Sequence, residues 1–186
     1  MKYLIEVESW LNRLYIAAEG ASLRQEDKRK AIEVAAMLEE VQRAIARFSR
    51  RNSLVLTDAA AGKSYVGLLS AKLVLEPSGK PASVIAIECD PDRIEASRRA
   101  AASLDTSITI ECRHARVEDE SAWPFQPSIV TALHACGNAS DTIIDRIIAC
   151  RARMLLLVPC CTSKSVTAST QEIGRASCRE RVCQYV

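Results

Sequence analysis

The residues best suited to ligand chemistry follow short apolar runs, where a chain leaving a β-sheet would turn. Asp58-Ala-Ala-Ala-Gly62-Lys-Ser64 comes directly after the apolar run that begins at Ser53. Small residues such as Ala60 and Gly62 allow a sharp turn and a close approach of a ligand to the backbone. The carboxylate of Asp58 could meet a cationic ammonium group. We therefore expect Asp58, Ala60 and Gly62 to bind a ligand.

Further polar residues follow the next two apolar runs. Glu88 closes the run Val84–Ile87, and a carboxylate at such a strand end can accept hydrogen bonds from both hydroxyls of a ribose. A surface position for Glu88 is the alternative, but the apolar run that it closes argues against it. His114-Ala115-Arg116 follows the third apolar run. The loop at that position would flank the adenine ring of a nucleotide bound to the sheet. We expect Ala115 and Arg116 to bind there and His114 to be a polar loop residue.

Segments with strand and helix patterns alternate along the chain, which predicts right-handed crossovers and a parallel sheet. We expect an α/β fold, a Rossmann-like doubly wound sheet of order 3-2-1-4-5 with an N-terminal helical extension. Ligands bind beyond the carboxyl ends of such strands. Strands are predicted at 53–58, 83–88, 106–112, 128–133 and 154–158, and helices at 3–19, 23–49, 63–75, 92–104 and 139–151.

The N-terminal region reads as two amphipathic helices. Ser22 begins a capping-box pattern with Gln25, and the second helix buries a stripe formed by Val34, Leu38, Val41, Ile45 and Phe48. Its first turns are basic, at Arg24, Lys28, Arg29 and Lys30, which we interpret as a solvated face rather than an RNA contact.

Bulk properties narrow the class of protein. The chain has 186 residues, is 48% hydrophobic and carries a net charge of +2, so it can bury a core and has no basic stripe typical of nucleic-acid binding. No apolar run is long enough to cross a membrane. A cytoplasmic protein with reduced cysteines is expected, and its oligomeric state is not predicted.

The C-terminal segment 172–186 is expected to be a non-native tail. Ile173–Val182 resembles translated adaptor sequence and shows neither a helical nor a strand period. We therefore divide the chain into an N-terminal helical extension (1–50), a ligand-binding core (51–171) that is incomplete after its fifth strand, and the tail. A truncated core would be expected to be unstable or inactive.

Two motifs, at the ends of the predicted fourth and fifth strands, resemble motifs of a known protein family. Leu133-His134-Ala-Cys136-Gly137, with Asp141, and Pro159-Cys160-Cys161 resemble a class I S-adenosylmethionine (SAM)-dependent methyltransferase family with Leu-His-x-Cys-Gly and Pro-Cys-Cys motifs. It includes the methyltransferase domain of glutathione-transferase-C-terminal-domain-containing proteins, and tRNA ribose 2′-O-methyltransferases are similar. The resemblance covers residues 53–164. In the first loop, Ala60 and Ser64 replace two glycines of the usual acidic-x-Gly-x-Gly-x-Gly pattern.

The resemblance implies SAM as cofactor and methyl transfer as activity. RNA is favoured as the acceptor by the resemblance alone, and protein or a small molecule stays open. The residues implied for the cofactor are Asp58, Ala60, Gly62, Glu88, Ala115, Arg116 and His134, and those for the acceptor pocket are Cys136, Asp141, Pro159, Cys160 and Cys161.

The roles of His134 and the cysteines stay open at this point. His134 is the best candidate for a general base, and it could equally hold its loop through a side-chain hydrogen bond to the backbone. Neighbouring cysteines on a strand point to opposite faces, so packing within the pocket is favoured over metal ligation, and no metal is expected. A thiol that carries the methyl group is a third possibility.

Two other classes of function compete with methyl transfer. A non-catalytic SAM- or nucleotide-binding module would act through its N-terminal helices. A dinucleotide oxidoreductase would need Gly-x-Gly-x-x-Gly, of which only Gly62 is present. A phosphate-binding loop is rejected because Thr57 stands where its first glycine belongs.

Overall fold

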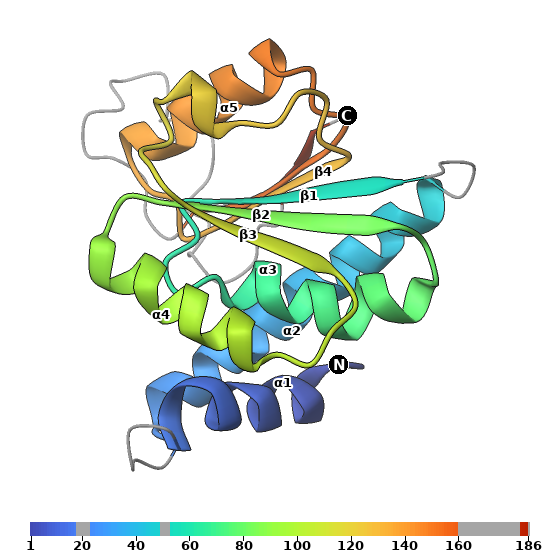
Figure 1. Cartoon of the computed structure of the whole chain (residues 1–186), viewed down its shortest axis with the longest axis vertical. Coiled ribbons are helices and arrows are strands. Elements are labelled where there is room, and N and C mark those ends of the chain that lie inside the picture. Colours follow the sequence, from blue (N-terminus) through green and yellow to red (C-terminus); the bar gives the residue numbers. More distant parts are fainter. Residues whose placement is uncertain (18–22, 49–52, 160–182, 186) are drawn as a thin grey trace, which may run out of the picture.

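The predicted parallel sheet forms the centre of the computed structural model, which describes residues 1–17, 23–48, 53–159 and 183–185 (Figure 1). The strand order is β3-β2-β1-β4-β5-β6, and the first five strands are parallel. This confirms the expected order 3-2-1-4-5. The strands are β1 (Leu54–Ala59), β2 (Ala82–Glu88), β3 (Thr109–His114), β4 (Ile129–Leu133), β5 (Leu155–Val158) and β6 (Cys183–Tyr185).

Helices cover both faces of the sheet, which explains why its strands are apolar along their whole length. In Figure 1, α5 lies above the sheet, whereas α3 and α4 lie below it with the N-terminal helices. Each face has its own hydrophobic cluster, one containing Leu56 and Leu156 and the other Ile87 and Leu157. The crossover helices are α3 (Tyr65–Ser70), which a π-helical segment (Ala71–Leu75) and a 3₁₀ turn (Glu76–Ser78) prolong, α4 (Pro91–Ser103) and α5 (Asn138–Ala149).

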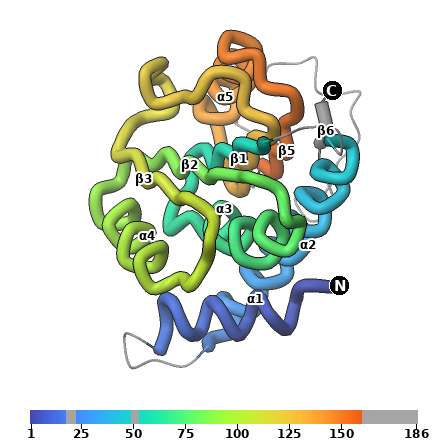
Figure 2. Tube along the Cα trace, turned by 45° about the vertical axis from the view of Figure 1, so that its right-hand side comes forward, coloured from blue at the N-terminus to red at the C-terminus, as the bar shows by residue number. Residues whose placement is uncertain are grey.

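The N-terminal helices are part of the same core. Helix α1 (Leu4–Leu11) continues as a π-helical segment (Asn12–Ile16), and α2 (Gln25–Arg47) follows. The predicted stripe of α2 is buried at Val34, Leu38, Val41 and Ile45 in the cluster that also holds Leu56 of β1, and Phe48 is partly buried against it. Figure 2 shows α2 running behind α3 toward the β5 edge of the sheet. The extension is therefore packed against the sheet.

Three local features differ from the prediction. Strand β3 begins at Thr109 because its first pairing partner on β2 is Ser83, so the expected start at residue 106 is wrong. Helix α2 is capped at Arg24, whose backbone N–H donates to Asp27 Oδ2 at 2.8 Å, and Ser22 lies outside the described residues.

No helix within the described ranges is both long and apolar enough to cross a membrane.

The third difference is the sixth strand. Cys183–Tyr185 pair antiparallel with Leu155–Leu157 of β5, although they belong to the segment expected to be a non-native tail. An edge strand offers unpaired N–H and C=O groups to any extended segment, which accounts for pairing regardless of a segment's origin. Residues 172–182 lie outside the described part of the chain.

Candidate functional site

The loop between β1 and α3 follows the backbone path expected of a glycine-rich turn. Ala60, Gly62 and Ser64 all have positive φ angles, of 51°, 58° and 52°. These are the three positions at which the acidic-x-Gly-x-Gly-x-Gly pattern has glycine. Ala60 and Ser64 hold this left-handed conformation at a cost of about 1–2 kcal/mol each. The loop therefore has the backbone shape of the glycine pattern, although two of the three glycines are replaced.

Asp58 holds this loop to the sheet. Its carboxylate is 2% exposed and accepts hydrogen bonds from the Gly67 backbone N–H at 2.9 Å and the Ser64 hydroxyl at 3.0 Å. Its other oxygen accepts from the hydroxyl of Thr131, its pairing partner on β4, at 3.0 Å. Burial raises the pKa of Asp58 to about 6, against the lowering effect of these hydrogen bonds and with a small further rise from Glu88. The expected contact with an ammonium group stays a prediction.

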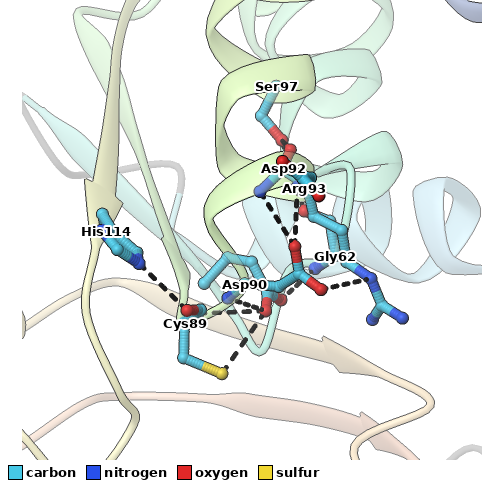
Figure 3. A network of polar contacts seen from close by, with 8 residues as sticks. Gly62, Cys89, Asp90, Asp92, Arg93, Ser97 and His114 are labelled. Atoms are coloured by element: carbon cyan, nitrogen blue, oxygen red, sulfur yellow. Dashed lines mark hydrogen bonds and ion pairs between the residues drawn. The ribbon is translucent and has the colours of Figure 1, made fainter.

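Glu88 holds the same loop from the end of β2. One carboxylate oxygen accepts from the Gly62 N–H at 2.6 Å, and the other accepts from the backbone N–H groups of Cys89 and Asp90 at 3.0 and 2.9 Å. Figure 3 shows Gly62 close to this turn. Glu88 is 6% exposed, so the surface alternative is wrong.

Two further side chains fix the carbonyl groups of the loop. The Ser97 hydroxyl on α4 lies 3.3 Å from Gly62 O and 3.0 Å from Arg93 O, and the Tyr15 hydroxyl donates to Lys63 O at 2.8 Å. Tyr15 also packs edge-to-face on Tyr65, with ring centroids 4.7 Å apart. Burial raises the pKa of Tyr15 well above its ordinary value, so this phenol stays protonated and able to donate.

A cavity of about 470 Å³ opens between this loop, helix α2 and the end of β4. Volumes of roughly 300–1,000 Å³ are typical of small-molecule sites. Helix α2 contributes Asp27 and Lys30 to the wall, so Lys30 is not part of a purely solvated face, whereas Arg24, Lys28 and Arg29 are exposed as predicted. The remaining lining residues are Asp58, Ala60, Ala61, Gly62, Lys63, Tyr65, Val66, Arg93, Leu133 and His134.

His134 lies in the cavity wall, at the end of β4, in an unusual backbone conformation. Its φ angle is 64°, and its backbone N–H donates to Val158 O on β5 at 2.8 Å. Its imidazole Nε2 lies 2.8 Å from Oε2 of Glu33 on α2. The side chain is thus paired with a carboxylate rather than with the backbone. A carboxylate accepts the hydrogen bond, so Nε2 is the donor, and in the neutral imidazole Nδ1 is then the acceptor.

The other predicted site residues lie apart from this cavity. The Ala115 N–H donates to Glu88 O at 3.0 Å, and Arg116 forms a surface ion pair with Glu118. Neither lines the cavity, and their predicted contact with adenine stays a prediction. His114 is the exposed last residue of β3 rather than the expected loop residue, and its Nε2 lies 3.0 Å from Cys89 O, as Figure 3 shows.

The predicted acceptor pocket is only partly described. Asp141 is exposed in the first turn of α5, and Cys136 and Pro159 are half-buried beyond β4 and β5. Cys160 and Cys161 lie outside the described residues. Cys136 is disulfide-bonded, unlike the expected reduced thiol, whereas Cys89, Cys112 and Cys150 are free thiols. Within the described ranges no cluster of three or more potential ligands could hold a metal.

The residues that sequence reasoning missed come mainly from the N-terminal helices. Asp27, Lys30 and Glu33 recur every three residues, which places them along one edge of α2 beside its buried stripe. That spacing was a usable signal. Tyr15 and Gly67 carried none, because their roles depend on which loop packs against them.

The methyltransferase-domain family matches residues 29–168. The chain belongs to this family. The match begins inside α2 and therefore includes Lys30, Glu33 and the whole described sheet up to β5. No curated protein matches the chain significantly.

Solved structures similar to this methyltransferase-family chain share its fold at low sequence identity. Magnesium protoporphyrin IX methyltransferase from Synechocystis, with bound S-adenosylhomocysteine, has a TM-score of 0.57 and 12% identity over 83% of this chain and 67% of its own. The same enzyme with bound SAM has a TM-score of 0.53. The tRNA methyltransferase TrmK from B. subtilis has a TM-score of 0.50 and 14% identity over 68% of this chain. The chain spans about two thirds of the first protein's length and 48% of TrmK's.

Proposed function

We propose that this chain transfers a methyl group from SAM, bound in the cavity beside the β1 loop, to an acceptor at the ends of β4 and β5. The observation that carries the proposal is the left-handed turn through Ala60, Gly62 and Ser64, held between Asp58 and Glu88. A turn of this shape lets a ligand lie close against the backbone. SAM is the expected cofactor because the family is one of methyltransferases and a solved neighbour binds it.

The residues of the cavity fit such a cofactor. No atom lies within 4 Å of the place where a Cβ on Gly62 would be, so a ligand has open access to that part of the backbone. Glu88 is not a lining residue but lies beside the cavity at the end of β2, where it is proposed to accept from a ribose, and His134 lines the cavity at the end of β4. We assign the adenosine half to the β2 side and the methionine half to the β4 side.

The chain's own part in the reaction is positioning and proton transfer. When bound, SAM would supply an electrophilic methyl group on a sulfonium. Displacement at that carbon needs an in-line approach, which a rigid loop and an enclosed cavity promote. For a hydroxyl acceptor, His134 would take the proton at Nδ1, because Nε2 is held by Glu33.

We propose RNA as the acceptor. Support comes from the resemblance of the His134 and Pro159 motifs to those of tRNA ribose methyltransferases.

The packing of the N-terminal helices argues against the alternative of a non-catalytic binding module. That alternative needs residues 1–50 to capture a partner. The apolar stripes of α1 and α2 are buried inside the chain's own core, at Val7, Leu11, Val34 and Leu38. Ile5 on α1 and Ile32 on α2 stay exposed, but they do not form part of these buried stripes.

Labelled methyl transfer tests the proposal. The chain is incubated with methyl-tritiated SAM and either total RNA or total protein, and SAM binding is measured in parallel by calorimetry. We expect SAM binding and tritium in RNA that ribonuclease releases. Tritium in protein alone would overturn the assignment of the acceptor, and failure to bind SAM would overturn the assignment of the cofactor.

A further inference from the structure

Lys30 is a cation built into the wall of the cavity. It lies on the second turn of α2, is half-buried, and faces the loop that follows β1. Its Nζ lies 5.1 Å from the centroid of the Tyr65 ring, within the range of a cation–π contact. This contact places the ammonium group beside the start of α3.

The charge of Lys30 is not neutralised by an ion pair within residues 1–17, 23–48 and 53–159. Arg93, which also lines the cavity, forms an ion pair with Asp90 at 3.5 Å on the β2 side. Lys30 is therefore positioned to receive an anionic group from a ligand.

The backbone of the β1 loop has few donors left for such an anion. Its Ala61 N–H donates to Ile87 O at 3.0 Å, its Gly62 N–H to Glu88 at 2.6 Å, and its Ser64 N–H to Ala61 O at 2.8 Å. A ligand anion against this loop therefore needs a donor beyond these three N–H groups, and a lysine side chain can supply one. Lys30 lines the same cavity from α2.

The position of Lys30 along the cavity indicates which anionic group of the ligand it would contact. Glu33, one turn further along α2, holds His134 at the end of β4. Lys30 is thus on the β4 side of the cavity, away from Glu88 at the end of β2. We assigned this side to the methionine half of the cofactor, whose only anionic group is its α-carboxylate.

We propose that the Lys30 ammonium group binds the α-carboxylate of the methionine half of SAM. This inference rests on the proposed cofactor. It makes the N-terminal helix α2 a direct part of the cofactor site, outside the loops to which the strand-end motifs point.

Calorimetry with two ligands tests the assignment. SAM carries the carboxylate, and 5′-methylthioadenosine keeps the adenosine and sulfur but has no amino-acid half. We expect Lys30→Met to lower the affinity for SAM at least tenfold, on the order of 1.4 kcal/mol, and to leave the affinity for 5′-methylthioadenosine unchanged. Lys30→Arg should keep most of the SAM affinity.

Matched variants distinguish the possible outcomes, and thermal melts show whether each variant is folded. Lys28→Met removes an exposed lysine from the same helix and should change neither affinity. Equal losses of both ligands in Lys30→Met, unchanged SAM affinity, or a selective SAM loss in Lys63→Met instead would each overturn the role of Lys30. Failure of the unaltered chain to bind either ligand would overturn the proposed cofactor itself, which is a distinguishable result.

Discussion

Glu33 and His134 are 101 residues apart in the sequence, and their side chains meet at 2.8 Å. The pair joins helix α2 to the end of β4 and fixes the imidazole at the edge of the cavity. His134 is 37% exposed and Glu33 44%, so both can be reached from solvent. A carboxylate that orients an imidazole and selects its tautomer is a common arrangement for a general base.

Replacing Glu33 should slow turnover without weakening SAM binding. Without the carboxylate, nothing selects the tautomer that leaves Nδ1 as the acceptor, so we expect Glu33→Ala to lower kcat about tenfold, since general-base catalysis as a whole contributes about 10²–10⁴-fold. Glu33→Gln keeps an accepting oxygen, so its kcat should lie between that of the unaltered protein and that of Glu33→Ala. Single-turnover rates and calorimetry measure the two quantities, with Glu26→Ala on the exposed face of α2 as the control. Equal kcat in Glu33→Ala and Glu26→Ala would contradict the positioning role.

Removing the imidazole itself should lower turnover more than replacing Glu33 does. We expect His134→Ala to lower turnover about 10²-fold or more while SAM affinity stays within a few-fold. The φ angle of 64° offers a matched variant, because His134→Gly also removes the imidazole but relieves the left-handed strain. Both variants should lose activity equally, and His134→Gly should be the more stable of the two. Parallel losses of SAM affinity and turnover would instead indicate a structural role.

The raised pKa of Asp58 predicts a pH dependence of stability. The carboxyl group has a pKa of about 6 in the folded protein, against 3.8 as its ordinary value. The folded state therefore binds this proton more tightly, and the contribution of Asp58 to stability is full below about pH 4 and is lost as the pH rises to about 6. The loss is on the order of 2–3 kcal/mol. Urea unfolding between pH 4 and 8 measures it.

Asp58→Asn is the variant that isolates this effect. The amide stays neutral and can still accept from Gly67 and Ser64, so the variant should lack this fall in stability between pH 4 and 6. Asp58→Ala should be less stable at every pH, because it leaves a buried Gly67 N–H unsatisfied at a cost of about 1–3 kcal/mol. Parallel pH curves for the unaltered protein and Asp58→Asn would show that this carboxyl group does not control the transition.

Gly67 should tolerate no side chain. A Cβ at this position would lie 2.7 Å from Ser64 Oγ and 3.0 Å from Asp58 Oδ2, inside the hydrogen-bonded tether of the loop. We expect Gly67→Ala to destabilise the protein by about 1–3 kcal/mol, as overpacking typically does, and to weaken SAM binding through the displaced loop. Unfolding curves and calorimetry test both effects. A fully stable Gly67→Ala protein would mean that Ser64 can move away without loss.

Gly62 and Gly79 form a matched pair for the loop's role in binding. Both have positive φ angles, of 58° and 67°, and neither would bring a Cβ within 4 Å of another atom. Each Gly→Ala change should therefore cost a similar 1–2 kcal/mol or so of stability. Only Gly62→Ala should also weaken SAM binding, because only Gly62 lines the cavity. Equal SAM affinities in the two variants would contradict the placement of the cofactor.

Sequence periodicity was enough to predict the sheet because burial repeats along each element. Five apolar runs became β1 to β5, with shifts of a few residues at their ends. The start of β3 could not be predicted, since it depends on its pairing with Ser83. The loop after β1 was located by its small residues, and its left-handed positions coincide with the glycine pattern even where the residues are Ala60 and Ser64.

Connectivity carries Asp58, Glu88 and His134 to one edge of any sheet of this order, so the sequence was sufficient to place these residues at the strand ends. Their contacts depend on how the helices pack against the sheet. A helix reveals which of its sides is apolar, but not which loop its polar edge will face. The position of α2 across the sheet therefore had to be known before Lys30 could be placed beside the cavity and Glu33 beside His134.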